Sequence, residues 1–217
     1  MTVLKKWLAV LFAAALATGI FPAQAAAAEA PDQLVRRISI DVLDAAKKDA
    51  DIKKGDMQRI LKLVDEKVMP YVDFNKTTSL AVGRHWRQAT PAQREELTKQ
   101  FHDLLFYTYA NAISKIDAKY KLEFMPLRAS ADATDVVVKS KITQPKNPEP
   151  ILLDYRLEKQ NNNWKIYDIN VMGSWLVENY KTTFSNEINR SGIDGLIKTL
   201  QDKNAALAKN QKSGAAK

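Results

Sequence analysis

The chain has 217 residues, a formal net charge of +8 at pH 7, no cysteine and two histidines, His85 and His102. The lack of cysteine excludes disulfides, thiolate catalysis and cysteine-bound zinc. The two histidines are also too far apart in sequence for a paired-histidine zinc motif on one helical turn.

The first 25 residues are typical of a cleavable signal peptide. Lys5 and Lys6 give a positive start, residues 7–21 are almost entirely apolar, and small residues follow Pro22. The apolar stretch is shorter than the roughly 20 residues that a membrane-spanning helix needs. We therefore predict export with cleavage after residue 25 or 28, although an uncleaved anchor is an alternative. The remaining residues 26–207 are expected to form a single domain with its own core.

Three helices are predicted before residue 90. The first opens at Pro31 and carries apolar residues at helical spacing. The second is capped by Asp56 and ends at Pro70, and a short third helix begins after Asp73.

The most strongly marked helix begins at Thr90. Thr90 suits the N-cap, Pro91 the first helical position and Gln93 the second half of a capping box. We expect this helix to run to about Ile116. Large apolar side chains at residues 106–107 widen its apolar stripe beyond a single packed face.

After about Tyr120 the apolar period changes from 3.6 to 2, which indicates strands. Turn-forming residues at 144–148 and 160–163 divide this region into four antiparallel strands in meander order. Their alternating apolar positions are Leu122 and Phe124, then Val136, Val138 and Ile142, then Ile151, Leu153, Tyr155 and Leu157, and finally the run Trp164–Val171, which is apolar on both phases.

Helical patterning returns after Gly173. Gly192 is expected to end one helix and Asp194 to cap the last one. Residues 208–217 are polar and small, which predicts a disordered basic tail. The predicted fold is α+β, with N-terminal helices, a four-stranded antiparallel meander sheet and closing C-terminal helices.

No set of residues predicts catalysis, a metal site or a cofactor site. The sequence has no nucleophile elbow, phosphate loop or paired-histidine motif. Asp168 on a predicted strand could be a buried acid, but a carboxylate bonded to backbone or to a basic neighbour is the expected role. We predict His85 to be a surface or packing residue and His102 to be partly buried. The protein is therefore expected not to be an enzyme.

The chain is instead rich in large apolar side chains. These could form an ordinary core, or they could line a ligand cavity between the sheet and the helices. The positive charge favours an anionic partner. Export and the mixing of basic with acidic residues argue against nucleic acid and favour lipid headgroups or phosphates.

Three segments resemble the MlaC or toluene-tolerance family of periplasmic phospholipid-binding proteins. Residues 82–93 read VGRHWRQATPAQ, residues 164–169 read WKIYDI, and residues 176–181 read LVENYK. The segments occur in the family's order and span essentially the whole mature chain. Two positions depart from the family, because Trp175 stands where a small Ser is usual and Lys181 where Arg is usual.

The resemblance implies a periplasmic carrier that moves glycerophospholipids between the outer and inner membranes and so maintains outer-membrane lipid asymmetry. Its implied partners are an outer-membrane lipoprotein–porin complex and an inner-membrane lipid ABC transporter with a periplasmic lipid-binding ring. The acyl chains would lie in an apolar cavity between sheet and helices. We expect a monomer with phospholipid as cargo and no cofactor.

The expected cavity walls combine one phase of each strand with apolar residues of the helices. They are Phe101, Leu105, Tyr109, Phe124, Val136, Val138, Ile142, Leu153, Tyr155, Leu176 and Tyr180. The candidates for contacting a headgroup or docking a partner are Arg84, Arg87 and Lys181.

Two alternatives remain open from the sequence. One is a periplasmic chaperone that binds apolar segments of polypeptides or lipoproteins. The other is a small cone-shaped enzyme that uses Asp168 as acid or base.

Overall fold

The computed structural model describes residues 29–116, 119–130, 132–144 and 147–214. The expected signal peptide, residues 1–25, and both candidate cleavage sites lie outside the described residues. None of the helices formed by the described residues has the length and apolar character needed to cross a membrane.

Helices precede and follow a single sheet, which confirms the predicted α+β class. The elements before the sheet are α1 (Pro31–Lys48), α2 (Ala50–Lys53), α3 (Met57–Lys67), the 3₁₀ turn η1 (Met69–Tyr71), α4 (Phe74–Val82), the 3₁₀ turn η2 (Gly83–Arg87) and α5 (Pro91–Ser114). The strands are β1 (Lys121–Phe124), β2 (Asp135–Gln144), β3 (Asn147–Gln160), β4 (Asn163–Val171) and β5 (Ser174–Trp175), and α6 (Leu176–Gly214) follows.

The capping residues predicted from the sequence open their helices. The side chains of Asp56 and Asp73 accept backbone N–H groups in the first turns of α3 and α4. Thr90 and Gln93 form both bonds of the capping box at the start of α5, at 3.2 and 3.0 Å. These side chains satisfy backbone donors that a helix start otherwise leaves unpaired.

The sheet has the strand order β1-β2-β3-β4-β5, and every pair is antiparallel. The four predicted strands are present in meander order, and β5 adds a two-residue fifth strand. Asn161 and Asn162 form the β3–β4 turn with φ of 46° and 67°. Asparagine adopts this left-handed conformation more readily than most residues, which suits a two-residue hairpin turn.

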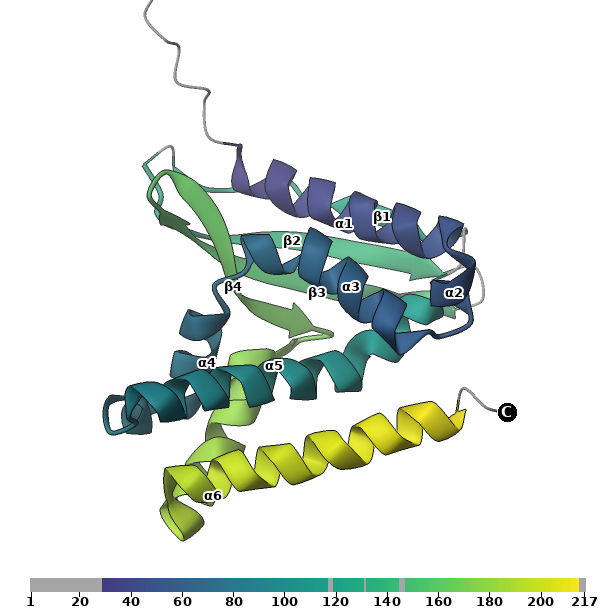
Figure 1. Cartoon of the computed structure of the whole chain (residues 1–217). Coiled ribbons are helices and arrows are strands. Elements are labelled where there is room, and N and C mark those ends of the chain that lie inside the picture. Colours follow the sequence, from purple (N-terminus) through teal and green to yellow (C-terminus); the bar gives the residue numbers. More distant parts are fainter. Residues whose placement is uncertain (1–28, 117–118, 131, 145–146, 215–217) are drawn as a thin grey trace, which may run out of the picture.

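The layers of helices and sheet that Figure 1 shows are held together by three hydrophobic clusters. One joins α1 to the face of β2, β3 and β4 that carries Val138 and Leu157, which we call the inner face of the sheet. A second joins α4, α5 and α6 around Phe101, and a third joins α1, α2, α3 and α5 around Ile60 and Phe106. Helix α5 contributes to two clusters, which explains the wide apolar stripe in its sequence.

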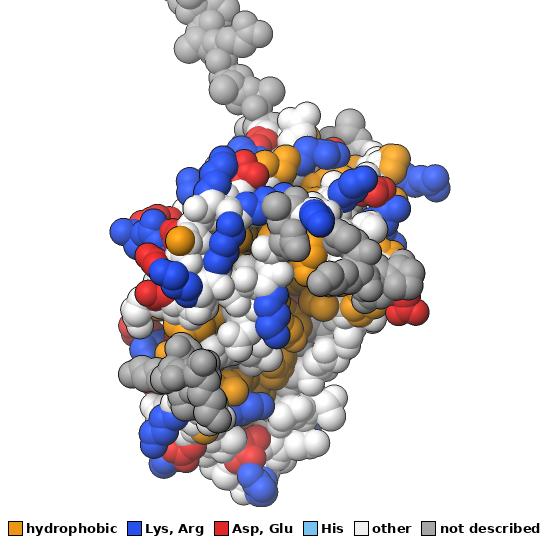
Figure 2. Space-filling model, turned by 90° about the vertical axis from the view of Figure 1, so that its right-hand side faces the viewer, with side chains coloured by type: hydrophobic (Ala, Val, Ile, Leu, Met, Phe, Trp, Pro, Cys, Tyr) orange, Lys and Arg blue, Asp and Glu red, His pale blue; other side chains and the backbone are white. Residues whose placement is uncertain are grey.

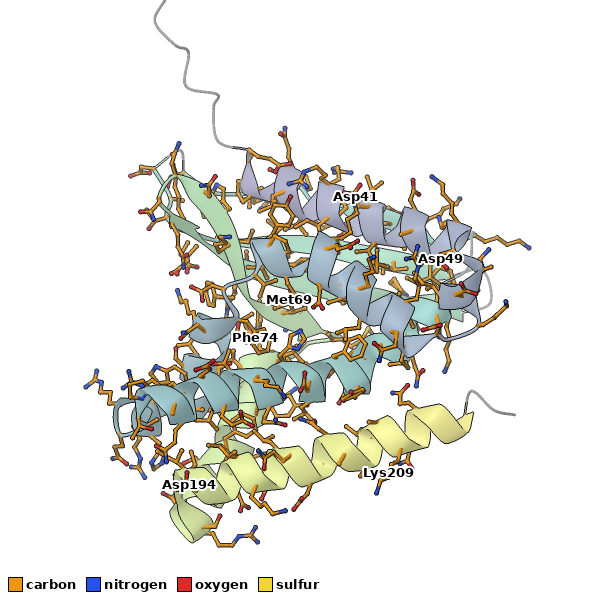
Figure 3. The ribbon with its side chains drawn as sticks, viewed as in Figure 1. Asp41, Asp49, Met69, Phe74, Asp194 and Lys209 are labelled. Atoms are coloured by element: carbon orange, nitrogen blue, oxygen red, sulfur yellow. The ribbon has the colours of Figure 1, made fainter. Side chains whose placement is uncertain are left out.

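Helix α6 bends at Gly192, whose φ of 75° and ψ of −178° interrupt the helical backbone. After the bend its second half, the α6 arm (residues 193–214), runs along α5 in the same direction (Figure 1). Figure 3 shows Asp194 at this bend, beneath the N-terminal end of α5. Successive contacts along both helices are Gln93–Asp194, Gln100–Asn204 and Tyr107–Gln211.

The predicted disordered tail is wrong as far as Gly214, because the α6 arm continues past Leu207 to that residue. Gln211 donates a hydrogen bond of 2.7 Å to the backbone oxygen of Tyr107. Lys, Gln and Ala are good helix formers, and only one side of this arm packs against α5. The polar composition of the segment after Leu207 therefore reflects a helix that packs on one side only, rather than disorder.

Candidate functional site

The antiparallel register places the six predicted strand residues on one face of the sheet. Pairing aligns Phe124 with Ser140, Val138 with Tyr155, and Ser140 with Leu153. Because side chains alternate between faces, every second residue along these strands shares the face. The inner face therefore holds Phe124, Val136, Val138, Ile142, Leu153 and Tyr155, as the predicted strand phase requires.

The inner face is closed at one end. Val136, Val138 and Leu157 are 6, 1 and 0% exposed, and they pack with Leu34 and Ile38 of α1. Val136 and Val138, predicted as cavity wall, therefore belong to the closed core that supports the wall.

The other end of the same face is open. Here the apolar residues are only partly buried, although they point to the same side as the closed core. This region, called the hollow, is lined by Ile142, Ile151, Leu153, Tyr155, Ile169 and Val171.

Figure 2 looks onto the end of the molecule where β2 ends and β3 begins, and it shows hydrophobic side chains gathered in a depression between the upper and lower layers. Helix α5 has its main contacts with other helices rather than with strands, so its backbone makes few close contacts with the sheet.

Tyr155 lies where the closed core gives way to the hollow. Its side chain is only partly buried, yet desolvation by the surrounding protein raises the pKa of its hydroxyl, against hydrogen bonds to Ser140 and Ser39 that lower it. Tyr155 also packs against the cluster around Val138 and Leu157, which places it at the boundary of the closed core.

The five predicted wall residues from helices divide in the same way. Phe101 is fully buried among the rings of α4 and α6, and Leu176 is 8% exposed, so both belong to the core. Leu105 and Tyr180 pack against that core and are partly buried, while Tyr109 is 40% exposed. Burial raises the pKa of the Tyr180 hydroxyl, and Tyr109 adds to the shift, which places the two phenols near each other.

The expected wall residues do not include three residues of the hollow: Ile151, which patterning places on the correct strand phase, and Ile169 and Val171, which it does not. The reason for the two on β4 is a bulge, because Arg156 pairs with Asp168 but the next residue of β3, Leu157, pairs with Ile166. The extra residue changes the phase of β4, which a sequence apolar on both phases does not reveal.

The three predicted basic residues lie near one another, away from the hollow. Arg84 and Arg87 are exposed on η2, which connects α4 to the N-terminal end of α5. The side chain of Lys181 passes 4.0 Å from the position a Cβ would occupy at Gly83, and its Nζ lies 3.9 Å from Glu178. Figure 1 places the N-terminal end of α5 at the opposite side from the open end of the sheet.

Asp168 is a structural residue of β4 that binds the start of α6. Its Oδ1 accepts the backbone N–H groups of Ile169 and Val177, and its Oδ2 accepts an N–H of Arg156 at 3.1 Å. The guanidinium of Arg156 in turn stacks 3.8 Å from the ring of Trp175. Burial raises the pKa of Asp168, opposed by these hydrogen bonds and by Arg156. Trp175 therefore supports this ion pair on the outer face of the sheet.

Both histidines take structural positions. His85 is 7% exposed in η2, and His102 is partly buried, with Nδ1 3.2 Å from Asp103 and its ring edge-on to Phe74. Among the described residues no group of three or more His, Asp or Glu side chains could hold a metal ion.

A family model, two relatives and a solved structure all agree with the family that the sequence resembles. Residues 36–202 match the family described as MlaC protein. The intermembrane phospholipid transport system binding protein MlaC of Haemophilus influenzae is 26% identical over 202 residues, which cover 91% of this chain and 92% of that protein. The toluene tolerance protein ttg2D of Pseudomonas putida is 25% identical over 209 residues, covering 96 and 93%.

A solved structure extends the similarity to three dimensions. The phospholipid-binding protein from Ralstonia solanacearum, determined in complex with a phospholipid, has a TM-score of 0.77 and 44% identity. The match covers 81% of this chain and 97% of that one. Because the family match spans most of the chain, this protein belongs to the MlaC family.

Proposed function

We propose that this protein is a periplasmic carrier that shuttles glycerophospholipids between the outer and inner membranes and thereby maintains outer-membrane lipid asymmetry. The observation that carries the proposal is the hollow, where one end of an apolar sheet face remains open beneath helices (Figure 2). Two similar proteins support it. The Haemophilus relative is named as the binding protein of an intermembrane phospholipid transport system, and the Ralstonia structure is a complex with a phospholipid.

The physical demands on such a carrier match this architecture. Each buried methylene gains about 0.8 kcal/mol relative to water, so two acyl chains of roughly 16 carbons gain on the order of 20 kcal/mol or more. Escape into water is then negligible, whereas a membrane offers the chains an equivalent environment. A carrier needs a dry apolar site that opens at a membrane or partner, and it needs no catalytic group.

The basic cluster of Arg84, Arg87 and Lys181 fits docking better than headgroup contact, because it lies away from the open end of the sheet. We propose an outer-membrane lipoprotein–porin complex and an inner-membrane lipid transporter with a periplasmic lipid-binding ring as the partners. Lys181 presents a point charge rather than the planar fork of an arginine, which suits general charge attraction.

The test uses two neighbouring leucines of β3 that point to opposite faces. Leu153 lines the hollow, and Leu152 is 46% exposed on the outer face. The purified wild-type protein is expected to yield stoichiometric phospholipid on organic extraction and mass spectrometry. Leu153→Gln should lose most of this lipid, because a buried amide without a partner is costly beside acyl chains. Leu152→Gln should retain it.

Circular dichroism and melting curves establish that both variants are folded. Equal lipid content in folded Leu153→Gln and wild type would contradict the assignment of the hollow. Extracts without phospholipid but with bound peptide would instead favour the chaperone alternative.

A further inference from the structure

A second depression lies on the side of α5 that faces away from the sheet. It forms where the α2–α3 turn, the C-terminal half of α5 and the end of the α6 arm meet, and its volume is about 550 Å³. We call it the lysine pocket; the residues that matter are Lys53, Lys54, Tyr107, Asn111, Lys115 and Gln211. The bond from Gln211 to the backbone oxygen of Tyr107 holds the α6 arm in place as one wall.

The lysine pocket is cationic without a compensating acid in its lining. It is lined by three lysines, and none of the described residues that line it is acidic. Lys54 has one described ion pair, a 3.6 Å contact with Asp51 in which both side chains are more than 60% exposed. Such an exposed pair neutralises little charge. No ion pair joins Lys53 or Lys115 to any residue of the described ranges.

A pocket of similar size elsewhere has a different charge pattern. The groove between α4 and α5 has a volume of about 570 Å³, and its lining includes Phe74, Arg94, Glu95 and Lys99. Figure 3 labels two residues of this lining, Met69 and Phe74, between α5 and the sheet. The lining of this groove, unlike the described lining of the lysine pocket, includes an acidic residue, Glu95, beside its cations. Lys99 pairs with an aspartate one turn along α5, and Arg94 donates to a backbone oxygen of η2.

The charge of the lysine pocket exceeds what the local helix ends require. Lys115 is the C-cap of α5, where its charge offsets the roughly half-unit negative end of the helix dipole. Lys53 and Lys54 belong to or follow α2, a four-residue helix with almost no dipole. Among the described lining residues an excess of positive charge therefore remains, next to the side-chain amide of Asn111 as a hydrogen-bond donor.

We propose that the lysine pocket binds a phosphate group, either of an anionic lipid headgroup at a bilayer surface or of free phosphate. Lysine ammonium groups attract phosphate as point charges and impose little geometry, so a monoester or a diester would fit. The α5 residues that line the pocket, Tyr107, Asn111 and the C-cap Lys115, lie on a different side of the helix from Leu105 and Tyr109. The α2–α3 turn and the end of the α6 arm lie at the same end of the molecule as the end of β2 (Figure 1). Binding of a lipid headgroup in this pocket would orient the protein so that the opening of the hollow faces the membrane that contains the lipid. This consequence rests on the proposed carrier function, whereas phosphate binding itself does not.

The experiment compares two double variants of the full mature chain with the same change in net charge. Lys53→Gln/Lys115→Gln removes two pocket lysines, and Lys139→Gln/Lys159→Gln removes two exposed lysines of β2 and β3. Binding is measured by flotation with vesicles of phosphatidylcholine alone or mixed with phosphatidylglycerol. A lysine close to an anionic surface strengthens binding about fivefold, so the pocket variant should lose on the order of 25-fold on the anionic vesicles. The control should lose markedly less.

Nuclear magnetic resonance titration with inorganic phosphate identifies the source of the phosphate. Saturable shifts at Asn111 and Lys54 that vanish in the pocket variant would show that free phosphate suffices. Vesicle binding that depends on the pocket, without such shifts, would assign the site to lipid headgroups. Equal losses in both double variants, with no phosphate shifts, would overturn the proposal.

The lipid content of the purified variants separates this proposal from the carrier function. The pocket variant should co-purify with as much phospholipid as wild type, because the pocket lies on a different side of α5 from Leu105 and Tyr109. A wild-type protein that carries no lipid but still binds phosphate here would refute the carrier function alone.

Discussion

Asp168 has an environment that acts on its charge in two opposing ways. Its side chain is 1% exposed, which disfavours the carboxylate, while Arg156 and two backbone N–H groups stabilise it. Burial is the larger effect, and the pKa of Asp168 is raised above its ordinary value of 3.8. The folded chain therefore holds this proton more tightly than the unfolded chain does.

This shift predicts how stability depends on pH. Between the ordinary and the raised pKa the folded state binds more protons, so the contribution of Asp168 to the free energy of unfolding falls as the pH rises through that window. Above the window the loss is complete. Asp168→Asn cannot titrate, so its stability relative to wild type should improve as the pH rises through the window. Urea denaturation at a series of acidic to neutral pH values measures the difference.

A substitution that removes no titratable group provides the control. The curve of Asn189→Ala, at an exposed position of α6, should run parallel to that of wild type over the same pH range. If the difference between Asp168→Asn and wild type stayed constant with pH, the shift at Asp168 would be absent.

At the scale of elements, the bend in α6 depends on one glycine. Gly192 combines a φ of 75° with a ψ of −178°, a backbone region that residues with a Cβ essentially avoid. No atom lies within 4 Å of a Cβ placed at this position, so the strain of a substitution would come from the backbone alone. The bend brings the α6 arm back along α5 and places Leu196 and Leu200 in the core.

Gly192→Ala is therefore expected to destabilise the protein by about 1–3 kcal/mol, measured by urea denaturation. Asn189→Ala, at an exposed helical position before the bend, should change stability by less than about 0.5 kcal/mol. A Gly192→Ala variant as stable as wild type would mean that the backbone at the bend relaxes to another conformation without cost.

Sequence patterns predicted the elements that carry local signals. Asp56, Asp73 and Thr90 marked three helix starts, and the change of period after residue 120 marked the sheet. The patterns missed α2 and β5, which have four and two residues and are too short for any periodicity. They also missed the α6 arm beyond Leu207, where contacts with α5 rather than composition decide the structure.

The site was predicted less completely than the fold, because alternation identifies a face but not how far the face is covered. Val138 and Leu153 have the same phase in the sequence. The position of α1 decides their surroundings. Val138 packs against α1 and belongs to the closed core, whereas Leu153 lines the hollow. The lysine pocket combines three segments distant in the chain, and no local pattern relates Lys53 to Lys115.

At the scale of the whole molecule, the proposed carrier function predicts that stability depends on bound lipid. An open apolar surface in the delipidated protein contacts water, whereas acyl chains bound as proposed would cover it. A ligand that binds only the folded state stabilises it, by about 3 kcal/mol when its free concentration is a hundred times the dissociation constant. For a chain of this size each kcal/mol shifts the melting temperature by about 2–4 °C.

Removal of lipid should therefore lower the melting temperature of the wild-type protein by on the order of 5–10 °C, and reloading with phospholipid should restore it. Differential scanning calorimetry of the purified, delipidated and reloaded protein measures this difference. In Leu153→Gln the three samples should melt at nearly the same temperature, because the variant binds little lipid. In Leu152→Gln the difference should match wild type, since this side chain lies on the outer face. A wild-type melting temperature that is the same with and without lipid would show that the acyl chains do not cover the hollow.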